Sequence, residues 1–257
     1  MTRVISGAAL AAAALAAILF LPVVGLRLLA CVVAAIGAHE YVRVAGAAGG
    51  VSQWVLIALV IAACWFTAVG LPVDAVAVLL IVLAWVAVEV LFLGRTIHQA
   101  GVSVIAPAYI GVPMGMLVGI HVGAGWRATV LLLATVVVSD SGQYYSGRAF
   151  GRRPLAPTIS PKKTVEGAVG GVVLGTAFMA IASAFVFPES NRAAAALLGA
   201  TIVLLGICGD LFESRLKRTT GIKDSSSLIP GHGGVLDRID ALLFATPAFY
   251  LYLRALG

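Results

Sequence analysis

Acidic residues at helical spacing are the first candidates for chemistry in this chain. Asp237 and Asp240 are three residues apart, so both side chains can lie on one face of a helix. Asp210 and Glu213 repeat that spacing. Like charges near lipid repel one another and are poorly solvated unless a cation or basic side chains offset them. Because oxygen ligands without His or Cys suit Mg²⁺, we predict one or two cations on Asp210, Asp237 and Asp240; simple pairing with nearby Arg and Lys is the alternative.

Basic side chains accompany these acids, and Lys and Arg are the usual partners of phosphate oxygens. They could also serve only to orient the chain and attract anionic lipid headgroups. Phosphate binding fits best where the bases lie beside serines, glycines and carboxylates. The bases are Lys162, Lys163, Lys217, Arg218, Lys223 and Arg238.

A glycine-rich turn, Pro-Gly-His-Gly-Gly, occupies residues 230–234. Gly233 and Gly234 would let backbone N–H groups come close to an anion. His232 either contacts the substrate or hydrogen-bonds within its own loop, and the sequence leaves both open. The chain contains no P-loop, HExxH or Ser-His-Asp signature. Acids for a divalent cation, bases for phosphates and a flexible turn together indicate phosphoryl or nucleotidyl transfer on a lipid-borne substrate.

The elements that must position these groups are membrane helices. Of the 257 residues, 61% are hydrophobic and 11% charged, and the mean hydropathy is +1.07. Lipid cannot satisfy backbone polar groups, so long apolar windows must be helical, and the period-2 alternation of a β-barrel is absent. We therefore predict an all-α polytopic integral membrane protein with about nine transmembrane helices, at residues 4–21, 23–45, 53–70, 73–93, 102–122, 127–149, 165–187, 192–213 and 235–256.

The distribution of Lys and Arg predicts the orientation. With the N-terminus in the cytoplasm, thirteen of the seventeen basic residues fall on cytoplasmic segments, and the opposite orientation reverses the bias. Both polar stretches, residues 139–167 and 214–240, then lie on the cytoplasmic face. The first window also resembles a signal peptide, but a retained helix is the favoured interpretation.

The remaining polar or small residues have simpler explanations. Glycines recur every fourth residue from Gly111 to Gly123 and from Gly167 to Gly175, which predicts close helix packing within the monomer or across a homodimer. Glu40 and Arg43 are expected to form an ion pair on a helix surface. Glu89 is expected to reach toward the cytoplasmic interface.

Three motifs carry a resemblance to a known family. The stretch "SRLKRTTGIKDSSSLIPGHGGVLDRID" (214–240) closely resembles the signature of the phosphatidate cytidylyltransferases, or CDP-diacylglycerol synthases. Upstream, "SPKKTVEG" (160–167) is similar to the family's S-P-K-K-T-W-E-G, with Val165 in place of Trp. "GDLFESRLKR" (209–218) matches G-D-L-x-E-S-x-x-K-R. The specific resemblance covers about residues 139–240, and the N-terminal half matches only as helical membrane sequence.

The resemblance implies that CTP and phosphatidic acid react with Mg²⁺ to give CDP-diacylglycerol and pyrophosphate. It implies catalytic roles for Asp210, Lys223, Asp237, Arg238 and Asp240. The triphosphate and phosphatidate would be held by Ser160, Lys162, Lys163, Ser214, Lys217, Arg218, His232, Gly233 and Gly234.

In that interpretation residues 1–125 are N-terminal transmembrane helices, and residues 126–257 form the catalytic region of one integrated membrane domain. The expected location is a bacterial-type inner membrane with the site facing the cytoplasm, and nucleic acid is not an expected partner. The alternatives are a CTP-dependent lipid-alcohol kinase and a transporter of an anionic substrate. The lack of an evident internal repeat and the position of the charges at one face disfavour a transporter.

Overall fold

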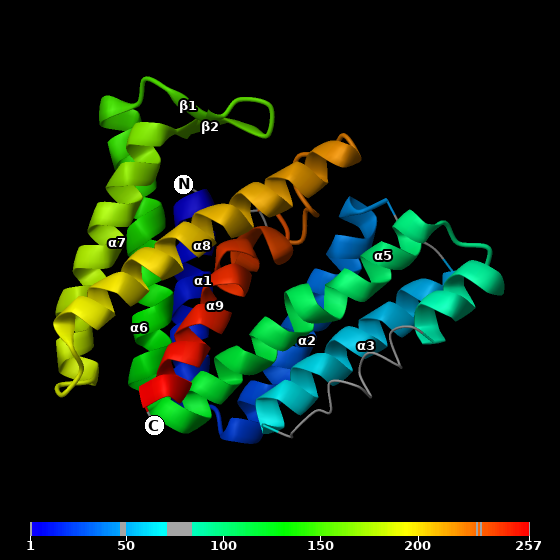
Figure 1. Ribbon diagram of the computed structural model, residues 1–257, viewed down its shortest axis with the longest axis horizontal. Helices are drawn as coiled ribbons and strands as arrows, with labels where there is room; N and C mark the ends of the chain where they lie inside the picture. Colours follow the sequence, from blue (N-terminus) through cyan, green and yellow to red (C-terminus); the bar gives the residue numbers. More distant parts are fainter. Residues whose placement is uncertain (1, 47–49, 71–83, 230, 232, 257) are drawn as a thin grey trace.

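The computed structural model describes residues 2–46, 50–70, 84–229, 231 and 233–256. Nearly all of these residues are helical, as the apolar windows predict (Figure 1). A further helical stretch covers residues 84–91. The helices are α1 (Thr2–Phe20), α2 (Val23–Val44), α3 (Gly50–Val69), α5 (Ile97–Ala106), the π-helical turn η1 (Pro107–Gly111), α6 (Val112–Phe150), α7 (Val165–Val186), α8 (Arg192–Thr219) and α9 (Leu236–Leu256).

Five helical segments of the described chain are long and apolar enough to cross a membrane: Val23–Val44, Ser52–Val69, Gln99–Phe150, Val165–Val186 and Arg192–Thr219. The apolar part of α1, Ser6–Phe20, is shorter, and α9 is not among the five. The predicted window at 73–93 lies partly outside the described residues. The fold class is therefore that of an all-α integral membrane protein. The count of nine spans stays a prediction.

A kink at Gly125 divides the longest helix. Gly125 has φ 81° and ψ 173°, so it interrupts α6 between residues 112–124 and 126–150. A side chain would strain this left-handed backbone, and glycine adopts it without penalty. The two halves correspond to the separate windows predicted at 102–122 and 127–149.

The glycine ladders pack helices against one another within the monomer. A Cβ added to Gly111 would lie 2.6 Å from the Val60 carbonyl oxygen, and one added to Gly115 would lie 2.5 Å from the Cys64 carbonyl oxygen. On α7, a Cβ at Gly167 would lie 2.8 Å from the Gln143 carbonyl oxygen of α6. Backbones approach this closely only where no side chain intervenes, so the prediction of close packing is confirmed.

A short β-hairpin departs from the all-α prediction. β1 (Pro154–Ala156) pairs antiparallel with β2 (Ser160–Thr164) and projects beyond the ends of α6 and α7 (Figure 1). Glu166 anchors it, since its carboxylate accepts hydrogen bonds from the backbone N–H groups of Arg152 (3.0 Å) and Arg153 (3.2 Å). The Thr164 hydroxyl accepts from Gly167 N at 3.1 Å and caps α7.

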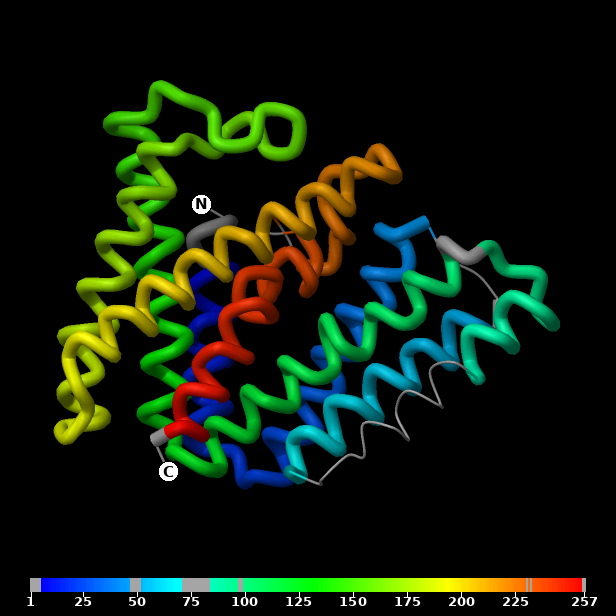
Figure 2. Tube along the Cα trace, viewed as in Figure 1, coloured from blue at the N-terminus to red at the C-terminus, as the bar shows by residue number. Residues whose placement is uncertain are grey.

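Helix α9 joins the two halves of the molecule. Leu236 and Leu243 belong to a core formed with α2, α3 and α5. Ala245 and Phe249 belong to a second core with α6, α7 and α8. Because α8 runs beside α9 (Figure 2), the beginning of α9 and the polar end of α8 meet at the end of the molecule that carries the hairpin.

Candidate functional site

Two adjoining cavities lie at the hairpin end of α6, α8 and α9. The first, called here the basic cavity, has a volume of about 500 Å³ and is lined by Arg148, Lys162 and Lys163 together with residues of α6, β1 and α7. The second, the acidic cavity, has a volume of about 260 Å³. Asp140 and Asp210 line both cavities, so the two spaces meet at these carboxylates. The charged residues of the acidic cavity are Asp140, Asp210, Glu213, Lys217, Asp224, Asp237, Arg238 and Asp240.

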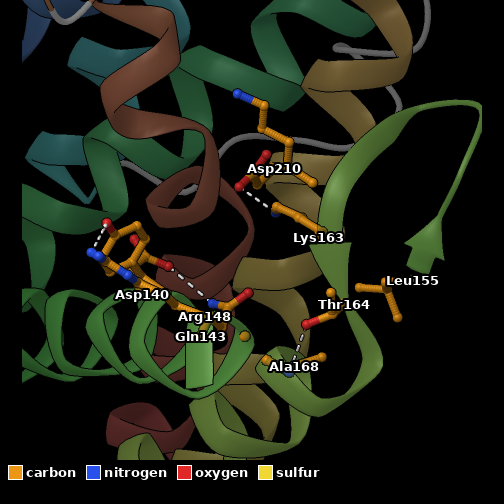
Figure 3. Close-up of a pocket in the computed structure, with 12 residues that line it drawn as sticks. Asp140, Gln143, Arg148, Leu155, Lys163, Thr164, Ala168 and Asp210 are labelled. Carbon is orange, nitrogen blue, oxygen red and sulfur yellow. Dashed lines mark hydrogen bonds and ion pairs between the residues drawn. The ribbon is translucent and has the colours of Figure 1, made fainter. Parts of the chain in front are cut away.

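An ion pair crosses the boundary between the cavities. Lys163 of β2 and Asp210 of α8 point toward one another and form a salt bridge (Figure 3). Both side chains are only partly exposed, at 21% and 36%. The Ser214 hydroxyl, one turn along α8, donates to Asp210 Oδ1 at 3.2 Å. The folded chain thus brings two predicted site residues from separate stretches into direct contact.

Lys217 lies between two carboxylates. Its Nζ is 2.5 Å from Glu213 Oε2 and 2.5 Å from Asp237 Oδ1. Glu213 is almost fully buried, so this ammonium group offsets a charge that would be costly to leave unpaired. The sequence predicted a phosphate contact for Lys217, whereas here the side chain links α8 to the start of α9.

Asp237 organises the loop that precedes α9. Its Oδ2 accepts hydrogen bonds from Ser225 N (2.9 Å), Ser225 Oγ (2.9 Å) and Gly234 N (2.8 Å). Gly233 has φ +80°, and a Cβ there would lie 2.6 Å from Asp237 Oδ2. The glycines are therefore required for close approach to a carboxylate of the chain itself, and the Gly234 N–H is already engaged.

Glu40 of α2 holds the same loop from the other side, which corrects the expected surface pair with Arg43. Glu40 is 2% exposed, and it accepts hydrogen bonds from the Ser225 and Ser226 hydroxyls at 2.9 and 2.6 Å. It also accepts from Val235 N at 3.1 Å and Leu236 N at 2.7 Å. The first N–H groups of a helix lack partners within it and favour a negative charge, so Glu40 caps α9 from another helix.

Sequence reasoning missed Glu40 because its partners lie far along the chain. The signal available was that Glu40 is the one acidic residue of the window at 23–45, since membrane helices rarely carry an acid. Glu89 is corrected in the same way, since it is fully buried and its Oε1 accepts from the Ser103 hydroxyl at 2.9 Å and from Ser52. Glu89 does not line either cavity of the candidate site.

Asp140 and Asp240 also line the acidic cavity. Asp240 is 9% exposed, and its Oδ1 accepts from Ala241 N at 2.7 Å. Asp140 of α6 was not among the predicted site residues, although it opens the polar stretch at the end of an apolar window. Together with Asp210, these carboxylates come from α6, α8 and α9 and face one space.

The other predicted residues take different positions. Arg238 lines the acidic cavity and Lys162 the basic one. Arg218 is turned toward the hairpin, and its Nε donates to the Ile159 carbonyl oxygen at 3.3 Å. Ser160 begins β2, and neither Ser160 nor Lys223 is among the residues that line the two cavities. His232 lies outside the described residues.

The carboxylates of the acidic cavity suit a hard divalent cation whose other ligands are water and substrate phosphates. Across the described part of the chain, no group of three or more His, Cys, Asp or Glu side chains is arranged as a ready-made metal site. Glu213 Oε1, however, is buried and has no hydrogen-bond partner. Mg²⁺ usually takes only one or two carboxylates and completes its shell with water and substrate phosphates, so an incomplete protein site is consistent with it.

Comparisons with known proteins identify the family of this chain. The sequence profile described as "Cytidylyltransferase family" matches residues 1–256. A Pseudomonas aeruginosa protein named phosphatidate cytidylyltransferase is 37% identical over 88% of this chain and 86% of its own length. A Helicobacter pylori protein of the same name is 34% identical over 85% of this chain and 79% of its own length. With Haemophilus influenzae phosphatidate cytidylyltransferase the identity is 47%, over 48% of this chain and 45% of the relative. A family match over nearly the whole chain, together with a relative of similar length, shows that this protein belongs to the cytidylyltransferase family.

Proposed function

We propose that the protein is a phosphatidate cytidylyltransferase, as its curated relatives are named. In this reaction a phosphate oxygen of phosphatidic acid forms a new bond to the α-phosphorus of CTP. The bond between the α-phosphorus and the bridging oxygen of the β-phosphate breaks, which releases pyrophosphate and leaves CDP-diacylglycerol. The nucleophile is already an anionic oxygen, so the chain needs mainly to position the two phosphates and offset their charge.

The observation that carries the proposal is the junction of the two cavities at Asp140 and Asp210. Lys162, Lys163 and Arg148 supply positive charge on one side of this junction, where phosphates would bind. Carboxylates from three helices lie on the other side. Lys163 pairs with Asp210 in the structure, and an arriving phosphate would compete for that lysine and free the Asp210 carboxylate.

The residues that would hold Mg²⁺ are Asp210, Asp240 and Asp140, with Glu213 Oε1 beside them. Asp237 was predicted as a ligand, but its two oxygens already accept hydrogen bonds from Lys217, Ser225 and Gly234. When bound, the cation would neutralise negative charge on the phosphates. Arg238 lines the same cavity and would contribute to this neutralisation.

We further propose nine membrane spans, with the N-terminus and both cavities on the cytoplasmic side of a bacterial-type inner membrane. Thirteen of the seventeen Lys and Arg residues fall on that side in this arrangement. The N-terminus lies at the same end of the molecule as the hairpin (Figure 1), which agrees with that placement. Cysteine accessibility at Arg152 and Arg192, both exposed, in whole cells would test it, because the two positions should react on opposite faces.

The decisive test is an assay of the purified protein with labelled CTP and phosphatidic acid, with and without Mg²⁺. We expect a CDP-lipid and pyrophosphate in equal amounts, and no product when diacylglycerol replaces phosphatidate. If CDP and a phosphorylated lipid form instead, the γ-phosphate is transferred and the protein is a lipid kinase.

A further inference from the structure

A second large cavity lies at the opposite end of the molecule from the candidate active site. It has a volume of about 520 Å³ and forms where the beginning of α2, the end of α3, the middle of α6 and the end of α9 come together. Figure 1 shows the C-terminus at this lower end and the hairpin at the upper end. Arg254 follows Asp240 by fourteen residues on α9, which at 1.5 Å per residue is about 21 Å along the helix.

Two arginines supply the charge of this cavity. Arg27 of α2 and Arg254 of α9 both line it, and no acidic residue of the described chain is among its lining residues. Arg27 Nε is buried and has no hydrogen-bond partner. Arg254 lies over the Tyr250 ring, with its guanidinium carbon 5.6 Å from the ring centroid. A buried donor without a partner destabilises the fold, so an acceptor that fills the cavity would stabilise it.

The walls around the arginines are apolar. Val69, Ile120, Phe187 and Leu253 contribute to them, from α3, α6, the end of α7 and α9. A small inorganic anion would satisfy the arginines but leave these walls uncovered. A molecule with an anionic head and hydrocarbon chains would satisfy both. Phospholipids have this structure, and their headgroups lie at the membrane surface, where the helix ends that form this cavity are located.

We propose that this cavity binds one anionic phospholipid of the leaflet opposite the active site. Its phosphate is held by Arg27 and Arg254, and its acyl chains lie along the apolar walls. The site is separate from the phosphatidate that reacts, because about 20 Å of helix separates Arg27 from Glu40, thirteen residues further along α2. The bound lipid ties the beginning of α2 to the end of α9.

Lipid binding to the full-length protein in detergent tests the proposal. Native mass spectrometry would count bound phosphatidylglycerol, with phosphatidylcholine of the same acyl chains and inorganic phosphate as comparison probes. The variant Arg27→Met/Arg254→Met removes both charges and keeps apolar bulk. The matched control is Arg192→Met, since Arg192 is exposed at the same end, at the start of α8, and does not line the cavity.

We expect the double variant to bind roughly threefold less phosphatidylglycerol than the wild type, or less still, while Arg192→Met matches the wild type. Phosphatidylcholine should bind equally to all three proteins, and phosphatidylglycerol should raise the unfolding temperature of the wild type more than that of the double variant. Equal phosphatidylglycerol binding by the wild type and the double variant would overturn the proposal. An equal stabilisation by inorganic phosphate alone would also overturn it, in favour of a free-anion site. Circular dichroism and gel filtration show whether each variant is folded without reference to enzymatic activity.

Discussion

The Glu40 carboxylate accepts a hydrogen bond from the backbone N–H of Leu236, 2.7 Å away and 196 residues further along the chain. A side chain of the second helix thereby sets where the last helix begins. Ser225, which also contacts Asp237, is held by the same carboxylate. The N-terminal helices are therefore coupled directly to the acidic cavity through one buried group.

Replacing Glu40 by Gln should lower kcat/KM roughly 10²-fold, because a loop displaced by about 1 Å misplaces Asp237 and Arg238. The amide would present N–H groups to donors that now face a carboxylate. Steady-state kinetics should show the loss in kcat more than in the KM for CTP, since the lysines of the basic cavity that we propose to bind phosphate are on β2. Glu40→Asp should restore part of the activity if the charge positions the loop.

The matched control for Glu40 is Arg43→Gln. Arg43 is exposed one turn along α2, and removing its charge should leave kcat and KM unchanged. A loss of activity in Arg43→Gln equal to that in Glu40→Gln would restore the helix-surface ion pair as the explanation.

Replacing Lys163 by Met should raise the KM for CTP roughly 10- to 100-fold, as expected for the loss of a charge-assisted contact to phosphate. Its salt bridge with Asp210 is also lost, but the carboxylate stays in place through Ser214. Arg215→Met is the control on the neighbouring helix, because Arg215 is exposed and lines neither cavity. Similar KM values for the two variants would remove Lys163 from the nucleotide site.

The roles of the acids can be separated by measuring metal binding itself. Titration with Mn²⁺ in the presence of CTP, followed by electron paramagnetic resonance, should show weaker binding in Asp210→Asn and Asp240→Asn. Asp237→Asn should bind Mn²⁺ nearly as well as the wild type but lose activity, since its oxygens accept from Lys217, Ser225 and Gly234. Weakened Mn²⁺ binding in Asp237→Asn would return that residue to the ligand set.

The glycine ladder of α6 offers a stability test within one helix. Gly115→Ala should destabilise the protein by about 1–3 kcal/mol, because its Cβ would lie 2.5 Å from the Cys64 carbonyl oxygen. Gly123→Ala, two helical turns later, meets nothing within 4 Å and should be neutral or stabilising by up to about 1 kcal/mol. Unfolding in detergent, followed by circular dichroism, measures both. Equal effects would mean that helix propensity, and not packing, dominates at these positions.

Much of this protein could be predicted from its sequence because hydropathy and spacing are local properties. Apolar windows must become helices in lipid, so the membrane class and most helix positions follow from composition. Glycines at four-residue spacing mark close helix contacts at Gly111, Gly115 and Gly167, although not at Gly123. Residue type and spacing within the charged motifs are enough to place Asp210, Lys163 and Asp240 among the candidate site residues.

The tertiary structure decided which charged side chains from distant parts of the sequence became partners. Lys163 meets Asp210 only because the hairpin folds back over α8, and residues 151–164 carry no apolar periodicity that predicts those strands. Lys217 pairs with Glu213 and with Asp237, which lies 20 residues further along the chain. Glu40 was expected at the surface because Arg43 lies close to it in the sequence, but it is buried and accepts a hydrogen bond from the first residue of α9. A hydrogen bond depends on distances of about 3 Å between groups that can be nearly two hundred residues apart, and local patterns contain no information on such distances.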